Sequence, residues 1–262
     1  MARNVADLAL FLDTMAGFCP KDPLTFDAPA TPFSAAALAP KAPVRVAFSA
    51  DFGGKIPMER ETREICTTAV RQFEAMGAIV EDASPDIGEI AEAFMVLRAQ
   101  SYVVDRELQL QSHRELIKSD IIWNTESGLQ ATPSRIAWAD RERAALYRRV
   151  VTFFETYDIL VTPGASAPAF DVNRRMPAAI DGKKLENYLG ASLITAVPTL
   201  MGTPSIAVPC GFDTWGRPVG LQIVGRPRGE AEIISAAALI EEALGLAGRV
   251  PIDPRPGTVP PA

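Results

Sequence analysis

The sequence is poor in the residues that bind metals or form disulfide frameworks. Among its 262 residues it has one histidine, His113, and three cysteines, Cys19, Cys66 and Cys210. The cysteines are odd in number, far apart and form no C-x-x-C pair, which is typical of a reducing cytoplasm and predicts no zinc site. The sequence also lacks G-x-x-x-x-G-K-[ST] and a G-x-G-x-x-G after a strand, so we expect no metal, nucleotide or other cofactor.

Positive charge is also in short supply. The net charge is −6 and the pI is near 5.0, whereas a nucleic-acid surface needs a basic patch. We therefore expect no nucleic-acid partner. The uncharged stretch Leu193–Phe212 is interrupted by Pro198, Pro204 and Pro209, so it is a poor membrane span. Asp7 interrupts the apolar start of the chain, which is unlike a signal peptide. We predict a soluble, cytoplasmic protein with no membrane partner.

The first eighty residues predict a helix followed by a βαβ unit. Asn4 is a good N-cap for a helix over Val5–Ala16. The Pro- and Ala-rich stretch Pro20–Pro43 favours an extended connection. A short apolar strand at Val44–Ser49, an amphipathic helix at Glu59–Met76 and a strand at Ala78–Val80 then predict a parallel pairing.

The middle of the chain is predominantly helical, over about residues 85–156. We predict one or two helices in Ile90–Gln111, a further helix in Leu116–Ser127, and a long helix that starts at Thr132-Pro133 and ends near Glu155. With the helical subregion included, residues 1–250 read as one α/β domain, and the proline-rich residues 251–262 as an extended or disordered tail.

The last third predicts the remaining strands. Tyr157–Pro163 is a buried, parallel-type strand, and the polar segment Asp171–Asn187 is a loop or lid. Next we expect a short buried segment up to Val197, a loop over Pro198–Pro204, and strands Ser205–Val208 and Val219–Val224 around a turn. A helix over Glu230–Ala247 closes the domain. A central hairpin without any chemistry is an alternative interpretation, which the spacing alone does not exclude.

Thr162 and Pro163 stand at the carboxyl end of a strand, where ligands gather in open α/β sheets. Together with the loop Gly164–Pro168 they are pocket candidates, although Pro163 could equally well do no more than end the strand.

A serine hydrolase would need His113 as its base and Ser166 or Ser192 as its nucleophile. Both serines lie in degraded G-x-S-x-G motifs without the final glycine, so this hypothesis is weak. Cys210, with no basic neighbour in sequence, reads as a buried small residue.

Three segments resemble the amidase signature family. GTPSIAVPCGFDTWGRPVGLQIVG at 202–225 is similar to its C-terminal motif G-x-P-A-x-S-V-P-x-G…G-x-P-V-G-L-Q-I-V-G. YDILVTP at 157–163 resembles Y-D-x-L-x-T-P, and MARNVADLALFLDTMAG at 1–17 resembles a segment from the middle of those enzymes. The resemblance implies the C-terminal part of the amidase signature fold, a mixed β-sheet flanked by helices.

The same resemblance implies that the chemistry lies elsewhere. Amidase signature enzymes hydrolyse C–N amide bonds with a serine, a bridging serine in a cis peptide and a lysine base, all in their N-terminal half. The sequence has no Gly/Ser-rich loop of the G-G-S-S-G-G-S type, and its lysines stand in polar or loop contexts. We therefore expect no catalytic residue here, and a pocket wall built from Thr162, Pro163, Thr195, Thr199 and Gly202. The family often has asparagine at the position of Thr199, which puts any polar contact from that position in doubt.

Two hypotheses follow. In the first, the chain is the C-terminal portion of an amidase, or one subunit of a split amidase, and is inactive alone. The complete enzyme would take a small-molecule amide, and this chain would associate with an N-terminal half or with itself, because half a sheet exposes an edge and apolar surface. In the second, the chain is a non-catalytic binding or assembly module that reuses the half-fold.

Overall fold

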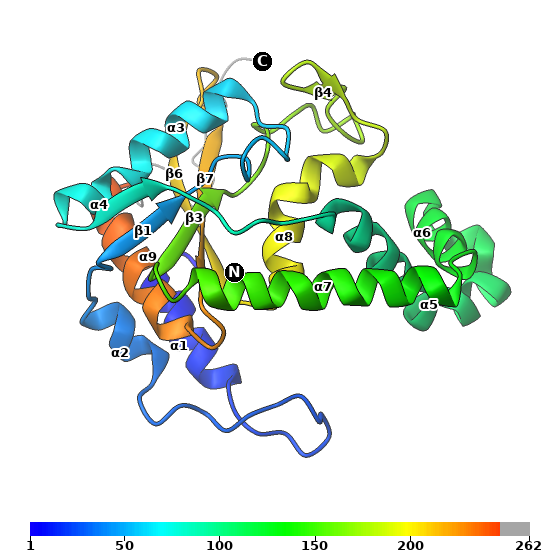
Figure 1. The fold of residues 1–262 in the computed structure, drawn as a ribbon, viewed down its shortest axis with the longest axis horizontal. Coiled ribbons are helices and arrows are strands. Elements are labelled where there is room, and N and C mark those ends of the chain that lie inside the picture. The colour runs from blue at the N-terminus through cyan, green and yellow to red at the C-terminus, as the bar shows by residue number, and fades with distance from the viewer. Residues whose placement is uncertain (247–262) are drawn as a thin grey trace, which may run out of the picture.

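A five-stranded mixed sheet organises the computed structural model, which describes residues 1–246 (Figure 1). The strand order is β2-β1-β3-β7-β6, in which β1 is parallel to β2 and β3, while β3–β7 and β7–β6 are antiparallel. The strands span β1 Arg45–Phe48, β2 Ile79–Asp82, β3 Ile159–Pro163, β6 Ser205–Phe212 and β7 Pro218–Gly225. The predicted βαβ unit and the antiparallel pair near the C-terminus are both confirmed. A separate hairpin of β4 Ala179–Ile180 and β5 Lys183–Lys184 lies within the predicted polar loop.

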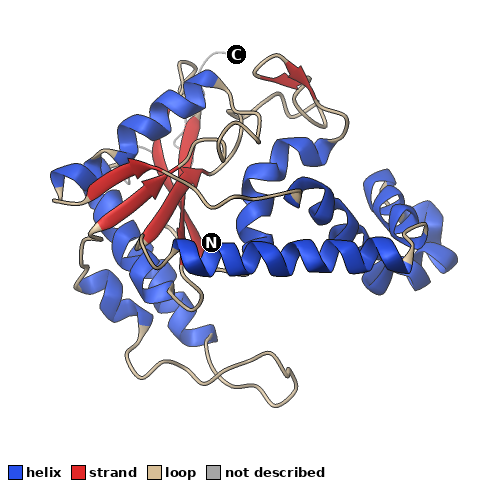
Figure 2. Cartoon of the chain, in the orientation of Figure 1, coloured by secondary structure: helices blue, strands red, loops and turns tan. Residues whose placement is uncertain are grey.

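Helices cover both faces of this sheet (Figure 2). Their bounds are α1 Val5–Met15, α2 Phe33–Leu38, α3 Arg60–Val70, α4 Gln72–Ala75, α5 Ile90–His113, α6 Ser119–Leu129, α7 Pro133–Phe153, α8 Leu193–Met201 and α9 Glu230–Leu244, with short 3-10 turns at Arg114–Leu116 and Tyr188–Ser192. One core packs α1, α3 and α9 around Leu221 and Ile223, and we call this side the α9 face. The other packs α5, α7 and α8 around Leu160 and Val224, and we call it the α8 face.

The first helix is tied to the last described one. The Asn4 side chain accepts a hydrogen bond from the Asp7 N–H at 2.7 Å, as its role as N-cap predicts. In addition, both carboxylate oxygens of Glu241 on α9 accept from the Val5 N–H, at 3.1 and 3.2 Å. A carboxylate at the positive end of a helix compensates the free N–H groups of its first turn. The position of α1 is thus fixed by a residue 236 positions away.

The helical subregion extends away from the sheet and is built on one close helix crossing. A Cβ added at Gly128 on α6 would lie 2.4 Å from the carbonyl oxygen of Ala99 on α5, so only glycine allows this approach. The long helix α7 begins as predicted, since the Thr132 hydroxyl accepts from the Arg135 N–H and Pro133 occupies the first turn.

Two connections predicted as irregular are helical instead. Helix α8 continues through the predicted loop Pro198–Pro204 as far as Met201, and Gly202 closes it with a φ of 66°. Pro198 cannot donate a hydrogen bond, which costs about 3 kcal/mol inside a helix. Burial of Ile194, Val197 and Met201 along one side offsets that cost. The prediction failed because tertiary packing outweighs local preference here.

The second correction concerns the Pro- and Ala-rich connection, which contains α2. Its first turn is capped by Asp13 of α1, whose carboxylate accepts from the Phe33 N–H at 2.5 Å and the Ser34 N–H at 3.0 Å. A cap supplied from 20 residues away leaves no local sequence signal. The predicted final helix ends at Leu244, and the predicted extended or disordered tail over residues 251–262 lies outside the described residues.

Candidate functional site

The five predicted pocket residues fall into two groups. Thr162 and Pro163, at the end of β3, are buried, and the Thr162 hydroxyl donates to the Pro163 carbonyl at 3.3 Å. Thr195, Thr199 and Gly202 instead form an exposed stripe along α8. The Thr195 hydroxyl donates to the Ser192 carbonyl and the Thr199 hydroxyl to the Thr195 carbonyl, so both side chains bond back to their own helix. The structure does not bring the two groups into one of the cavities described below.

A row of side chains joins the buried end of β3 to the sheet edge. Thr162 is paired with Gln222 of β7, and Gln222 is paired with Ala207 of β6. Directly opposite residues of an antiparallel pair share a face, and Thr162 lies on the same face as Leu160, which is in the α8 core. The Gln222 side-chain oxygen is buried and has no hydrogen-bond partner within residues 1–246, although buried polar atoms are nearly always paired. The row ends at Ala207, which is exposed.

The loop after β3 is held in place by backbone contacts. The Gly164 N–H donates to the Gly220 carbonyl at 2.8 Å, and the Ser166 carbonyl accepts from the Glu59 N–H at 2.9 Å. Ser166 is completely buried, and its hydroxyl has no hydrogen-bond partner in the described part of the chain. The loop is therefore part of the sheet's rigid surroundings, and it adds a second unpaired polar group at the carboxyl end of β3.

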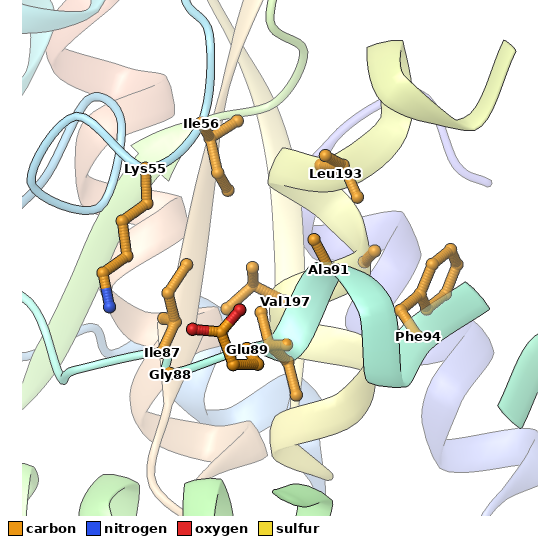
Figure 3. A pocket seen from close by; sticks show the side chains of 11 residues that line it. Lys55, Ile56, Ile87, Gly88, Glu89, Ala91, Phe94, Leu193 and Val197 are labelled. Carbon is orange, nitrogen blue, oxygen red and sulfur yellow. The ribbon is translucent and has the colours of Figure 1, made fainter. Parts of the chain in front are cut away.

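A cavity of about 280 Å³ opens between α8 and the start of α5 (Figure 3). Its walls are mostly apolar, and Lys55 and Phe94 lie on opposite sides of it. The Lys55 ammonium is held by Asp86 at 2.6 Å. The lining residues are Lys55, Ile56, Ile87, Gly88, Glu89, Ile90, Ala91, Phe94, Leu193, Ala196 and Val197. Sequence reasoning missed this cavity, because its walls come from three segments that share no motif.

No described residue forms a catalytic pair of the kinds weighed from the sequence. All six lysines, Lys21, Lys41, Lys55, Lys118, Lys183 and Lys184, are exposed, as their polar contexts predict. His113 is exposed, and its Nδ1 contacts the Ser112 hydroxyl at 2.7 Å rather than Ser166 or Ser192. Over residues 1–246 no cluster of His, Cys, Asp or Glu could hold a metal ion, and no helix is long and apolar enough to cross a membrane.

Cys66 and Cys210 are buried neighbours rather than nucleophiles. Their Sγ atoms lie 3.8 Å apart. The hydrogen bond between the two thiols, together with burial, raises the pKa of the Cys66 thiol far above its ordinary value. Because the thiolate is the reactive form, this thiol stays unreactive. The prediction that Cys210 is a buried small residue is confirmed.

The amidase family model matches residues 1–234 of the chain, which includes every strand of the five-stranded sheet. This chain belongs to the amidase family. An acylamidase from Rhodococcus erythropolis is 30% identical over 256 residues, which cover 97% of this chain and 53% of the relative. A glutamyl-tRNA(Gln) amidotransferase subunit from Moorella thermoacetica is 29% identical over 266 residues, which cover 92% of this chain and 53% of the relative.

The fold agrees with that of solved amidase signature enzymes. A bacterial aryl acylamidase superposes with a TM-score of 0.81 at 21% identity, over 96% of this chain and 55% of the other. The predicted fold, a mixed sheet flanked by helices in part of an amidase signature enzyme, is thereby confirmed. This amidase-family chain spans about half the length of the curated relatives it matches.

Proposed function

We propose that this chain supplies part of an amidase-signature hydrolase that cleaves C–N amide bonds, and that it has no amidase activity alone. One observation carries the proposal: in a chain of this family every lysine is exposed. The family resemblance implies a lysine base, and a lysine can act as base near neutral pH only where burial keeps it uncharged. The base and its serines would then have to come from a complementary segment.

The proposed contribution of this chain is structural and substrate-binding. It would provide the sheet and one wall of the pocket, with Thr195, Thr199 and Gly202 facing the complementary segment and Thr162 and Pro163 behind them. The unpaired Gln222 oxygen and Ser166 hydroxyl mark the polar end of that wall. A small-molecule amide is the proposed substrate, and a relative named acylamidase supports an acyl amide in particular. A reducing cytoplasm is the proposed location, because the buried Cys66 and Cys210 are free thiols.

The test compares this chain alone with the chain co-expressed with the portion of the Rhodococcus acylamidase that its match leaves uncovered. Hydrolysis of a chromogenic anilide is measured in both samples after matched purification. We expect hydrolysis only in the co-expressed sample. Turnover by the chain alone, at a rate that follows its concentration and is absent from a mock purification, would contradict the proposal.

A second candidate is a non-catalytic assembly module. The naming of several relatives as subunits of an amidotransferase favours it, since such proteins act within complexes. In this case the chain and a complementary segment should form a complex of correct stoichiometry that hydrolyses no anilide. That result would favour the assembly module over the split hydrolase.

A further inference from the structure

We infer that the free edge of β6, together with an apolar groove beside α1, is the docking surface for a complementary amidase segment that adds a strand to the sheet. The inference rests on the proposed function, because it names the surface through which that function would be completed. Within residues 1–246, β6 is the last strand of the five-stranded sheet and pairs with β7 alone, so the alternative of a central hairpin does not hold for its first strand.

The register shows which backbone groups of β6 are free. The Pro204 carbonyl accepts from the Gly225 N–H at 3.0 Å, and hydrogen-bonded pairs alternate along an antiparallel ladder. Residues 206 and 208 therefore bond toward β7, and the backbone groups of Ser205, Ala207 and Pro209 point outward. Pro209 has no N–H, so over residues 205–209 the edge offers two donors, at Ser205 and Ala207.

An apolar groove of about 650 Å³ accompanies the start of this edge on the α9 face. Its lining comes from Met1, Ala2 and α1, from residues 204–207, and from Ile233 and Ile234 of α9, with Glu230 as its one charged residue. Phe11 and Met15 of α1 contribute large apolar side chains that are 51% and 59% exposed. An added strand that alternates its side chains would put apolar groups into this groove while its backbone pairs with Ser205 and Ala207.

The length of the relatives identifies the occupant. The solved aryl acylamidase shares this fold over 55% of its chain, so 45% of it has no counterpart in this chain. A second copy of this chain fits less well. An antiparallel pair of two β6 edges centred on Ala207 sets Pro209 opposite Ser205 at both ends, and each end then lacks one donor. A strand from a different segment can end before it reaches Pro209, so that no hydrogen bond of the new ladder lacks its donor.

The first experiment measures capture. This chain, carrying an affinity tag, is co-expressed with the uncovered portion of the Rhodococcus acylamidase, and the stoichiometry of the purified complex is read by native mass spectrometry. Phe11→Asp is compared with Leu10→Asp, which changes a residue of the same helix that is 59% exposed and outside the groove. We expect a one-to-one complex with the wild-type and Leu10→Asp chains, and at least about tenfold less complex with Phe11→Asp, which puts a charge into apolar surface.

The second experiment does not depend on two separate chains. The same acylamidase portion is joined upstream of Met1, and amide hydrogen exchange is measured at residues 205–208 in the joined and in the original chain. We expect the Ser205 and Ala207 amides to exchange on the order of 100-fold more slowly in the joined chain. The Ile206 and Val208 amides, which already bond toward β7, should be protected in both chains.

The outcomes separate the two proposals. Equal capture by the wild-type chain and both variants, no capture by the wild-type chain, or unchanged exchange at Ser205 and Ala207 would each overturn the docking surface. A homodimer that Phe11→Asp dissociates would assign the surface to a second copy and also overturn it. A complex that Phe11→Asp weakens but that hydrolyses no anilide would support this docking surface and reject the split hydrolase. Anilide hydrolysis that is unchanged by Phe11→Asp would support the split hydrolase and reject this docking surface.

Discussion

The Sγ atoms of Cys66 on α3 and Cys210 on β6 lie 3.8 Å apart, both buried in the core of the α9 face. The third cysteine, Cys19, is exposed. Because the Cys66 thiol has a raised pKa and neither buried thiol is accessible to reagents, only Cys19 should react in the folded chain.

We therefore expect Ellman's reagent to titrate one thiol per folded chain and three after denaturation. Cys19→Ser should reduce the folded value to zero and leave the unfolding transition unchanged. Rapid reaction of two thiols in folded Cys19→Ser would show that α3 and β6 separate readily.

The turn between β6 and β7 contains a buried carboxylate with a pH-dependent contribution to stability. Burial of Asp213 would raise its pKa, but hydrogen bonds from the Arg217 backbone, the Arg217 guanidinium and the Trp215 N–H lower the pKa below its ordinary 3.8. A carboxyl group with a lowered folded-state pKa stabilises the fold above its unfolded pKa, and this stabilisation is lost as the pH falls through the folded pKa.

Asp213→Asn should accordingly lower the free energy of unfolding by about 1–3 kcal/mol at pH 7. The difference from the wild-type chain should shrink as the pH falls below about 4. Urea unfolding at a series of pH values measures this, with Asp27→Asn, at an exposed position, as the control. A difference that stays constant from pH 7 to pH 3 would refute a role for the charge.

Glu241 is expected to hold the first helix onto the last described one. Replacing it with alanine removes the acceptor for the Val5 N–H and should destabilise the chain by about 1–2 kcal/mol. The loss should be local, so limited proteolysis should cut within residues 1–15 sooner than elsewhere. Glu242→Ala, at the exposed neighbouring position, should behave like the wild-type chain; equal sensitivity of the two variants would argue against the cap.

The crossing of α5 and α6 should not tolerate a methyl group at Gly128. In an open helix, glycine to alanine gains up to about 1 kcal/mol. Here the new Cβ would lie 2.4 Å from the Ala99 backbone oxygen and 2.5 Å from the Val103 side chain, so overpacking by about 1–3 kcal/mol prevails. Thermal unfolding of Gly128→Ala and of the control Ser127→Ala, at the half-buried neighbouring position, measures the difference. A melting temperature for Gly128→Ala at or above that of the control would contradict the close crossing.

What the sequence predicted well has a local physical cause. Asn4 and the pair Thr132-Pro133 start helices because their side chains or fixed φ act on the adjacent turn. The buried strand ending at Thr162 and Pro163 follows from its unbroken apolar run. The family follows from the ordered motif at residues 202–225, which forms the paired strands β6 and β7.

What it missed depends on contacts between distant segments. Asp13 caps α2 across 20 positions, and the packing of Ile194 and Met201 keeps Pro198 inside a helix. The edge position of β6 depends on the strand order of the whole sheet. The local sequence around Val208 would be equally suitable for a central strand and for an edge strand. The roles of Thr195 and Thr199 in a pocket wall stay predictions, because the described residues do not include the opposite side of such a pocket.

Pro209 limits how this edge of β6 can pair with further strands. A long, flat edge with regular donors lets one molecule template the next, as in fibrils. Here the donors stop after Ala207, and the ladder with β7 shifts register between Pro209 and Gly211. The Ser205 and Ala207 donors are therefore too few for the regular ladder that a continuous cross-β stack needs. Pro209 is thus a gatekeeper residue that opposes edge-to-edge association of this chain.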